Sequence, residues 1–229
     1  MLYTFAFFHP PTPTLQTCLE QIPGIQGSLR VYATESLAAA VEPLGDLEEL
    51  RRSDHVLLTS ALRHDDVIQA LFAQTPLLPV RFGTCFPSLD QLLGYLKEQS
   101  PSLLEKLRVL GHRAEYILKI HVDPLPVGTD ELPRSGTDYL LSRQQHYRTY
   151  QSAQQQRQDE HAALLALWPP EWPQQSLSPL EQEWGRYTFL LSEEQAAVAQ
   201  SLGAQWQQQH PHWHLHWTPP LPPYHWLNP

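Results

Sequence analysis

The histidine-rich segment His210-Pro-His-Trp-His-Leu-His216 carries side chains that are suited to bind a metal ion. Alternate residues of a strand share one face, so His212, His214 and His216 would project together. Neutral imidazoles at that spacing are ligands for divalent transition ions, and a metal-dependent enzyme is therefore one hypothesis. The alternative is a half-buried strand whose outer face is formed by histidines. We favour this alternative, because the sequence shows no carboxylate nearby that would orient the imidazoles.

The run Arg63-His64-Asp65-Asp66 also contains groups that are capable of acid–base chemistry. A run of this composition more often begins a helix, where the two carboxylates are favourable against the positive end of the helix dipole. We favour this structural interpretation over a catalytic one.

Arg81 is a charged residue inside the apolar segment Leu78-Pro-Val-Arg-Phe-Gly83. A charged group that is buried needs partners, and the planar guanidinium suits a carboxylate or several carbonyl groups. We therefore predict that Arg81 is largely buried and paired. Contact between Arg81 and a ligand is the alternative.

Signatures of catalysis are missing from the rest of the chain. It contains no Gly-x-Gly-x-x-Gly, phosphate-binding loop, His-Glu-x-x-His or Cys-x-x-Cys, and its two cysteines, Cys18 and Cys85, are far apart. The net charge of −9 over 229 residues argues against a large interface with nucleic acid. No stretch is apolar enough for a membrane helix, and we expect neither a signal peptide nor a cofactor. These features favour a soluble, cytosolic protein, and the missing motifs do not by themselves exclude an enzyme, since catalytic triads assemble from distant positions.

Apolar periodicity predicts the elements that position these residues. The N-terminal half should contain strands at 2–8, 29–33 and 77–84, and helices at 15–22, 62–72 and 88–110, the last capped by Ser88. The C-terminal half should contain strands at 115–122, 187–191 and 213–217, and helices at 137–167 and 193–209. Gly111 separates two mixed sets of elements, so we predict an α+β protein with domains at 1–110 and 111–217.

Several motifs in order along the chain resemble the GvpF/GvpL family of gas vesicle proteins. They are His64-Asp-Asp-Val67 at a helix start, Leu77-Leu-Pro-Val-Arg-Phe-Gly-Thr84, Glu115 to Lys119, and Gly136-Thr-Asp-Tyr-Leu140. The tail Pro219-Pro-Leu-Pro-Pro-Tyr-His-Trp226 is similar to the Gly-Pro-Trp-Pro-Pro-Tyr-x-Phe tail of cyanobacterial members. In this chain Pro219, Leu221 and Trp226 replace the usual Gly, Trp and Phe.

The resemblance implies two α+β domains, the second a ferredoxin-like variant with inserted helices. It also implies a non-enzymatic accessory or minor structural protein of the gas vesicle, which contacts the hydrophobic major shell protein and other accessory proteins during assembly. A soluble chaperone or adaptor for shell subunits, absent from the mature vesicle, is the alternative. No nucleic acid or lipid membrane is expected as a partner, and no catalytic, cofactor or metal residues are expected.

The residues expected to matter for structure or interaction lie in the Arg-Phe-Gly motif and in the tail. They are Arg81, Phe82, Gly83, Pro222, Pro223, Tyr224 and Trp226. Prolines restrict the unfolded tail and so lower the entropy lost when it docks, and the aromatic residues supply apolar area. We predict that residues 218–229 are ordered and pack between the two domains.

Overall fold

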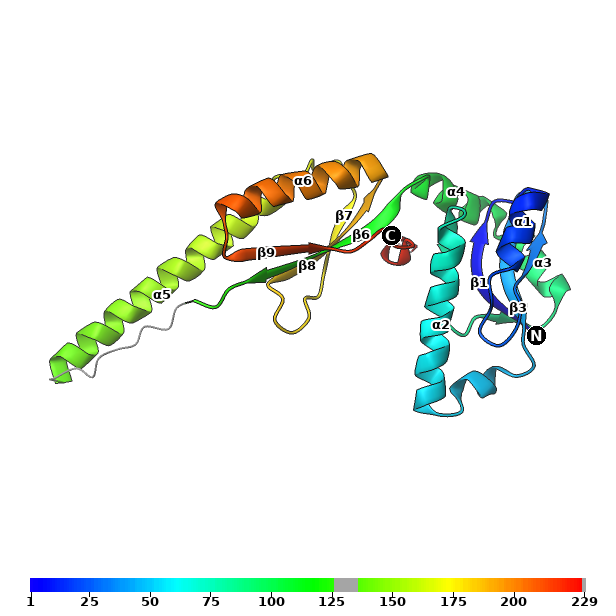
Figure 1. The fold of residues 1–229 in the computed structure, drawn as a ribbon, viewed down its shortest axis with the longest axis horizontal. Coiled ribbons are helices and arrows are strands. Elements are labelled where there is room, and N and C mark those ends of the chain that lie inside the picture. The colour runs from blue at the N-terminus through cyan, green and yellow to red at the C-terminus, as the bar shows by residue number, and fades with distance from the viewer. Residues whose placement is uncertain (126–135, 228–229) are drawn as a thin grey trace. The chain divides into compact units, whose positions relative to one another are not determined.

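The structure is a computed structural model that describes residues 1–125 and 136–227 of the chain (Figure 1). The chain divides into two compact units. Unit 1 contains Met1–Tyr116, Leu190–Glu193 and Pro219–Pro229, and unit 2 contains Ile117–Phe189 and Glu194–Thr218. The strand at 115–122 lies in a sheet separate from the strands at 2–8 and 29–33. The assignment of 1–110 and 111–217 as separate domains stays a prediction.

Unit 1 is built on an antiparallel sheet of order β2-β3-β1-β4, with β5 paired to β1. Its elements are β1 (Leu2–Phe8), α1 (Pro13–Glu20), β2 (Arg30–Ala33), β3 (Ala38–Pro43), η1 (Leu47–Arg51), α2 (Asp54–Phe72), β4 (Leu77–Pro79), β5 (Cys85–Phe86), α3 (Leu89–Glu98), α4 (Ser100–Leu110) and, in the tail, η2 (Tyr224–Trp226).

The central strand β1 is covered on both faces, which explains its unbroken apolar sequence. Tyr3, Phe5 and Phe8 pack in one core cluster with residues of α2, whereas Phe7 packs in a second cluster with leucines of α3 and α4. The pairing of β1 with β3 shifts register between Thr4 and Ala6. Unit 1 therefore has an apolar core on each side of its sheet.

Helices α2 and α3 of unit 1 begin at serine side chains that cap them. Ser53 accepts a hydrogen bond from the backbone of Val56 at the start of α2, and Ser88 accepts one from Gln91 at the predicted start of α3. The prediction of one helix over 88–110 is wrong, because α3 ends at Glu98 and α4 begins at Ser100. Pro101 lies in the first turn of α4, where its missing N–H is tolerated; inside a continuous helix its ring would clash with a carbonyl.

The second sheet has the order β7-β8-β6-β9. Its strands and helices are β6 (Ala114–Val122), α5 (Gly136–Leu165), β7 (Gln174–Leu177), β8 (Gly185–Leu191), α6 (Glu193–Gln209) and β9 (Trp213–Trp217). In chain order this is a βαββαβ unit with the strand order 2-3-1-4, which is the ferredoxin-like arrangement. The predicted α+β class is therefore confirmed.

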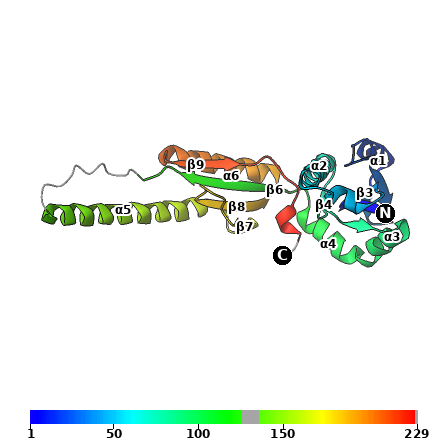
Figure 2. The same cartoon turned by 90° about the horizontal axis from the view of Figure 1, so that it is seen from below.

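Helix α5 extends well beyond the strands of its own unit in both views (Figures 1 and 2). Its C-terminal end is anchored by Leu164, which is fully buried, and by the adjoining Trp168, whose indole N–H donates to the carbonyl of Ala199. Towards that end, Gln155 and Gln156 donate to the carboxylates of Asp159 and Glu160 four residues later. Packing holds one end of the helix, and no side chain described between residues 139 and 158 is buried.

Candidate interaction sites

The segment that follows β4 makes a tight turn over Arg81–Thr84. The backbone N–H of Thr84 donates to the carbonyl of Arg81 at 3.2 Å, and Gly83 has a φ of 87°. A positive φ at the third position of such a turn defines type II geometry, which glycine adopts without steric cost. The carbonyl of Thr84 then accepts from Thr4 of β1, so the turn is tied to the sheet.

A buried histidine of α2 holds this turn in place through a chain of hydrogen bonds. The Nε2 of His64 lies 2.9 Å from the carbonyl oxygen of Val80, and its Nδ1 lies 2.9 Å from the hydroxyl of Tyr3. A carbonyl oxygen only accepts, so Nε2 carries the proton and Nδ1 accepts from Tyr3. The Tyr3 oxygen in turn accepts from the N–H of Gly83 at 3.2 Å. The chain runs from Gly83 through Tyr3 and His64 to Val80.

Aromatic rings surround the imidazole of His64. Phe5 stacks on it at 5.4 Å between ring centroids, and Tyr3 and Phe82 meet it edge-on at 5.5 and 5.6 Å. Burial among these rings lowers the pKa of His64 below its ordinary value of 6.5. The histidine is therefore neutral at neutral pH, as the hydrogen-bond chain requires.

The prediction that Arg81 is buried is wrong. Its side chain is exposed and lines an open hollow of about 300 Å³ beside Phe86 and Leu227. The strand β4 ends at Pro79, two residues before Arg81. Arg81 therefore lies outside the sheet, and the alternation of side chains between the two faces of a strand does not direct it into the core. The buried polar group beside this segment is His64 instead.

The interpretation of Asp65 and Asp66 as a helix start is also wrong. Helix α2 begins at Asp54, and the Arg63–Asp66 run therefore lies in its interior. Ser53, followed by Asp54, was the signal for the start. The carboxylate Oδ2 of Asp66 lies 3.8 Å from Nη1 of Arg63. The carboxylate of Asp65 accepts a hydrogen bond from the hydroxyl of Tyr224 in the tail.

The C-terminal tail docks on unit 1 through the buried Glu115. Leu221 and Glu115 exchange two backbone hydrogen bonds of 2.9 Å. The carboxylate of Glu115, which is fully buried, accepts from the backbone N–H of His225 at 2.9 Å and bonds to the imidazole Nδ1 of the same residue. A glutamate inside the apolar run 114–118 thus has its partners in a segment more than 100 residues later in the chain.

Apolar and cationic contacts complete the docking of the tail. Pro222 and Pro223 are buried; Tyr224 packs against the core cluster of α2, and Trp226 packs against the cluster of α3 and α4. Lys106 donates to the carbonyl of Leu227 at 2.7 Å. Burial, together with Asp65, raises the pKa of the Tyr224 phenol well above its ordinary value of 10. The position of the tail between two domains stays a prediction.

Two histidines pair with separate carboxylates: His212, which directly precedes β9, and His214, which lies within it. His212 Nε2 lies 2.9 Å from Glu160 Oε2, which also accepts from the indole of Trp213 at 2.8 Å. His214 Nε2 lies 2.9 Å from Asp123 Oδ1. The expectation that no carboxylate lies nearby is wrong, because Glu160 comes from α5 and Asp123 follows β6. Within residues 1–125 and 136–227, no three histidine, cysteine, aspartate or glutamate side chains are grouped to hold a metal ion.

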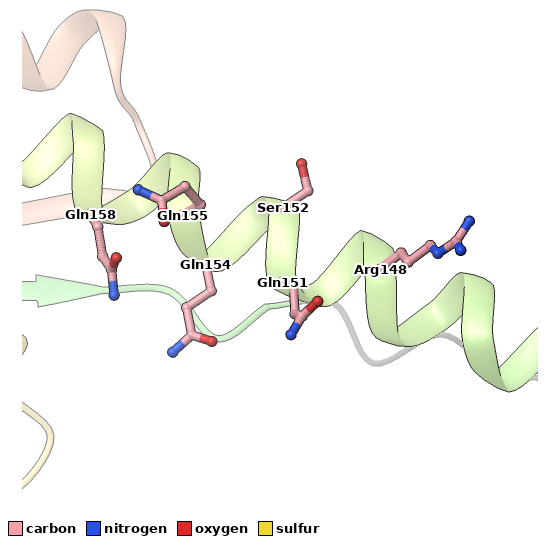
Figure 3. Close-up of a pocket in the computed structure, with 6 residues that line it drawn as sticks. All are labelled: Arg148, Gln151, Ser152, Gln154, Gln155 and Gln158. Carbon is pink, nitrogen blue, oxygen red and sulfur yellow. The ribbon is translucent and has the colours of Figure 1, made fainter.

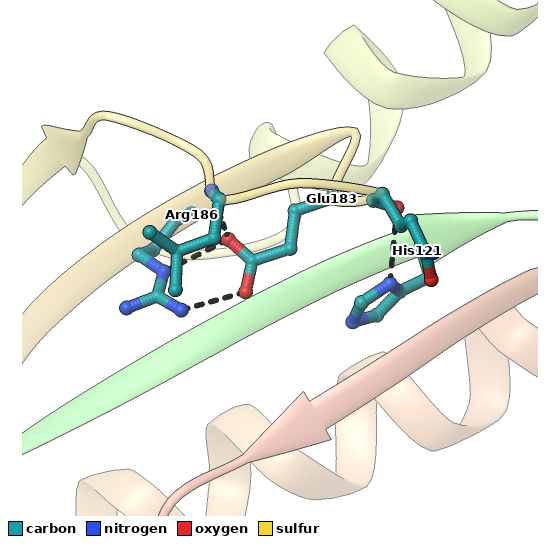
Figure 4. A network of polar contacts seen from close by, with 5 residues as sticks. His121, Glu183 and Arg186 are labelled. Carbon is teal, nitrogen blue, oxygen red and sulfur yellow. Dashed lines mark hydrogen bonds and ion pairs between the residues drawn. The ribbon is translucent and has the colours of Figure 1, made fainter.

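A bidentate ion pair closes the loop before β8 (Figure 4). Arg186 donates from Nε and Nη2 to the two carboxylate oxygens of Glu183, at 2.9 and 2.7 Å. Glu183 also accepts from the backbone N–H of Leu180 at 2.8 Å, and His121 bonds to the neighbouring carbonyl of Gln182. The hydrogen bonds from Arg186 lower the pKa of Glu183 from 4.5 to about 2.

The depressed pKa of Glu183 predicts a stability effect in acid. Glu183 stabilises the folded state fully above pH 4.5, its ordinary pKa, and this contribution is lost as the pH falls towards about 2. Arg186→Met should lower stability at neutral pH by about 1–3 kcal/mol, because the Glu183 carboxylate loses the two hydrogen bonds from Arg186 and keeps only the one from Leu180. It should also flatten the fall in stability over that acid interval. Denaturant unfolding between pH 4.5 and about pH 2 measures both effects, and Arg148→Met on exposed α5 is the control. If the stability of Arg186→Met falls as steeply with pH as that of the wild type, Arg186 is not the cause of the lowered pKa of Glu183.

Exposed leucines form an apolar patch on the outer face of α2. Leu58 is 62% exposed and Leu62 is 61% exposed, and the two residues lie one turn apart. The opposite face of the same helix buries His64, Val67, Ile68 and Leu71. We call Leu58 and Leu62 the leucine patch.

The structure gathers the predicted interaction residues into two places. Phe82 and Gly83 belong to the turn held by His64, and the tail residues Pro222 to Trp226 pack on unit 1. Their roles in binding a partner stay predictions. Sequence reasoning missed the Glu183–Arg186 pair and the leucine patch. The i, i+4 spacing of Leu58 and Leu62 was a signal, but it did not show which face of the helix was buried.

The described helices include none that is long and apolar enough to cross a membrane. Comparison with solved structures shows the fold. The gas vesicle protein GvpF from Anabaena superposes with a TM-score of 0.70 at 16% identity, covering 100% of this chain and 96% of that chain. GvpF from Microcystis aeruginosa superposes with a TM-score of 0.63 at 16% identity, covering 100% of this chain and 99% of that chain.

Sequence comparison gives the family. A curated gas vesicle protein F from a Streptomyces species is 29% identical over 121 residues, which are 53% of this chain and 48% of that relative. The match thus spans about half the length of the curated relative. The model of the gas vesicle synthesis protein GvpL/GvpF family matches residues 1–228. The chain therefore belongs to the GvpL/GvpF family of gas vesicle synthesis proteins.

Proposed function

We propose that the chain is a non-enzymatic accessory or minor structural protein of gas vesicle formation, acting at the vesicle by contact with the hydrophobic shell protein during assembly. Family membership supports the connection with gas vesicles. The observation that carries the contact is the leucine patch of α2, with two leucines more than 60% exposed on one helical face. Contiguous exposed apolar residues mark sites of protein interaction.

The physical basis of this contact is apolar burial. Covering Leu58 and Leu62 with an apolar partner contributes about 1.5–3 kcal/mol for each side chain. The patch lies on a helix whose other face is packed in the core, so it is presented on a rigid element. A small hydrophobic subunit is the partner that such a surface fits best.

The double variant Leu58→Gln/Leu62→Gln should weaken binding of the shell protein by at least about tenfold, because the apolar area is replaced by amides. Its melting temperature should stay close to that of the wild type, because both side chains are exposed. Val109→Gln is the matched control, since Val109 is 53% exposed on α4 of the same unit. Co-purification of tagged chain with co-expressed shell protein measures the effect. If the double variant recovers as much shell protein as the wild type does, the leucine patch is not the contact surface.

Purified vesicles separate the structural role from the alternative, a soluble chaperone or adaptor. Vesicles are floated, washed free of loosely bound protein and probed with an antibody to this chain. A minor structural component stays with the washed vesicles. A chaperone is found with shell subunits in the soluble fraction and is absent from the washed vesicles, and that result would replace the structural proposal.

A further inference from the structure

The outer part of α5 has a composition unlike the rest of the chain. Residues 139–158 contain three arginines, Arg143, Arg148 and Arg157, and no aspartate or glutamate, although the whole chain has a net charge of −9. Arg143 donates to the hydroxyl of Tyr139 at 3.4 Å. Neither Arg143 nor Arg148 forms an ion pair with a carboxylate among the residues that the structure describes. Within the part of the chain that the structure describes, this stretch of the helix therefore presents positive charge that no carboxylate neutralises through an ion pair.

Aromatic and apolar side chains accompany these arginines on one stretch of helix. Leu140 is 66% exposed, Tyr147 is 61% exposed, and Tyr139 and Tyr150 are each 48% exposed. Leu140 and Tyr147 are seven residues apart, so they recur on the same face. With Arg143, His146 and Tyr150 they line an open hollow of about 480 Å³. We call Tyr139, Leu140, Arg143, Tyr147 and Tyr150 the tyrosine stripe.

The next turns of α5 are polar (Figure 3). Arg148, Ser152 and Gln155 follow one edge of the helix, and Gln151, Gln154 and Gln158 follow another. Such a helix obtains little stability from packing, because no described side chain between 139 and 158 is buried. The large hydrophobic side chains that are exposed on α5 among the described residues all belong to the tyrosine stripe, which is therefore where a partner would be held.

We propose that the tyrosine stripe of α5 is a docking surface for an acidic amphipathic helix of a partner protein. Tyrosine and arginine are the residue types that recur at the centres of protein interfaces. An apolar face flanked by carboxylates would cover Leu140 and Tyr147 and neutralise Arg143 and Arg148. A second copy of this chain fits poorly, because pairing two stripes would bring like charges together. The proposal concerns unit 2 and goes beyond the shell contact assigned to the leucine patch.

Binding of a designed peptide to the purified full chain tests this proposal. The probe is a fluorescently labelled amphipathic helix with leucine on one face and glutamate on the other, and its partner probe has lysine in place of every glutamate. The acidic peptide should bind at least about tenfold more tightly than the basic one at low salt, and less tightly as salt is added. Equal binding of the two peptides, or binding of neither, overturns the proposal.

Variants assign the binding to the stripe. Arg143→Glu/Arg148→Glu should reverse the preference between the two peptides, whereas Arg52→Glu/Lys97→Glu, exposed residues of unit 1 with the same change of charge, should preserve it. Tyr147→Ser/Leu140→Ser should weaken acidic-peptide binding by about tenfold. Circular dichroism confirms that each variant is folded. Leu58→Gln/Leu62→Gln should bind the acidic peptide as the wild type does, so failure of the shell contact and failure of this proposal are distinguishable.

Three other results overturn the proposal. One is an equal loss of binding in Arg52→Glu/Lys97→Glu, which means that net charge alone attracts the peptide. Another is displacement of the acidic peptide by single-stranded RNA of equal charge at lower concentration, which makes α5 a nucleic-acid surface. The third is self-association of the free chain in sedimentation experiments that Tyr147→Ser/Leu140→Ser abolishes, which makes the stripe a contact between copies.

Discussion

Removal of residues 219–229 should lower the stability of unit 1 by about 3–5 kcal/mol, because it leaves the buried carboxylate of Glu115 without its partners. The truncated chain also loses the two backbone hydrogen bonds between Leu221 and Glu115. It exposes the apolar surface that Trp226 covers on the cluster of α3 and α4. A loss of this size corresponds to a fall of about 10 °C in melting temperature, which calorimetry measures.

A double-mutant comparison isolates the role of Glu115. Glu115→Leu in the full-length chain should be destabilising, because it leaves the donors of His225 without an acceptor. In the truncated chain the same substitution should restore part of the lost stability, since it removes an unpaired buried charge. Unchanged melting of the truncated chain, or additive effects of the two changes, would contradict the docking of the tail on Glu115.

The variant His64→Ala should destabilise unit 1 by about 3–5 kcal/mol, because it leaves a cavity among aromatic rings and two polar groups without partners. The Tyr3 hydroxyl loses its acceptor and the Val80 carbonyl loses its donor. His64→Phe should fill the space and still cost about 1–3 kcal/mol through the lost hydrogen bonds. His55→Ala, an exposed position of the same helix, is the control. Denaturant unfolding followed by tyrosine and tryptophan fluorescence measures all three.

The same histidine predicts a pH dependence. The pKa of His64 is lowered in the folded state, so below its ordinary value of 6.5 the unfolded chain binds a proton that the folded chain does not. Stability should therefore fall as the pH drops below 6.5, and the fall should be shallower in His64→Phe. An identical pH profile in the variant would show that His64 is not held neutral in the core.

The strongest local patterns predicted elements correctly. The apolar run of β1, the strand β6, the helix α6 and the strand β9 lie where the sequence places them. The strand β3 was missed, because Ala38-Ala-Ala-Val41 favours a helix by intrinsic propensity and is held as a strand by pairing with β1 and β2. The strand β7 was missed because its polar Gln-Gln-Ser carries no apolar alternation, and it pairs with β8 alone at the sheet edge.

The candidate sites depend on contacts that no local pattern encodes. Glu115 and His225 meet across 110 residues, and Asp65 and Tyr224 meet across 159. The sequence signals a buried charge at both Glu115 and Arg81, since each lies among apolar residues. Glu115 is inside a strand and is buried, whereas Arg81 lies past the end of one and is exposed. Whether a charged residue among apolar neighbours is buried or exposed therefore depends on where the strand ends, and the sequence does not show that position.

Restoration of gas vesicles in cells tests the central proposal most directly. Cells that lack the gene receive the wild type, Leu58→Gln/Leu62→Gln or Val109→Gln, and the fraction of turbidity that collapses under pressure measures their vesicles. We predict that the deletion abolishes collapsible turbidity and that the wild type and Val109→Gln restore it. The double variant, although folded and present at equal level, should not restore it. Full restoration by the double variant, or normal vesicles without the gene, would contradict the central proposal.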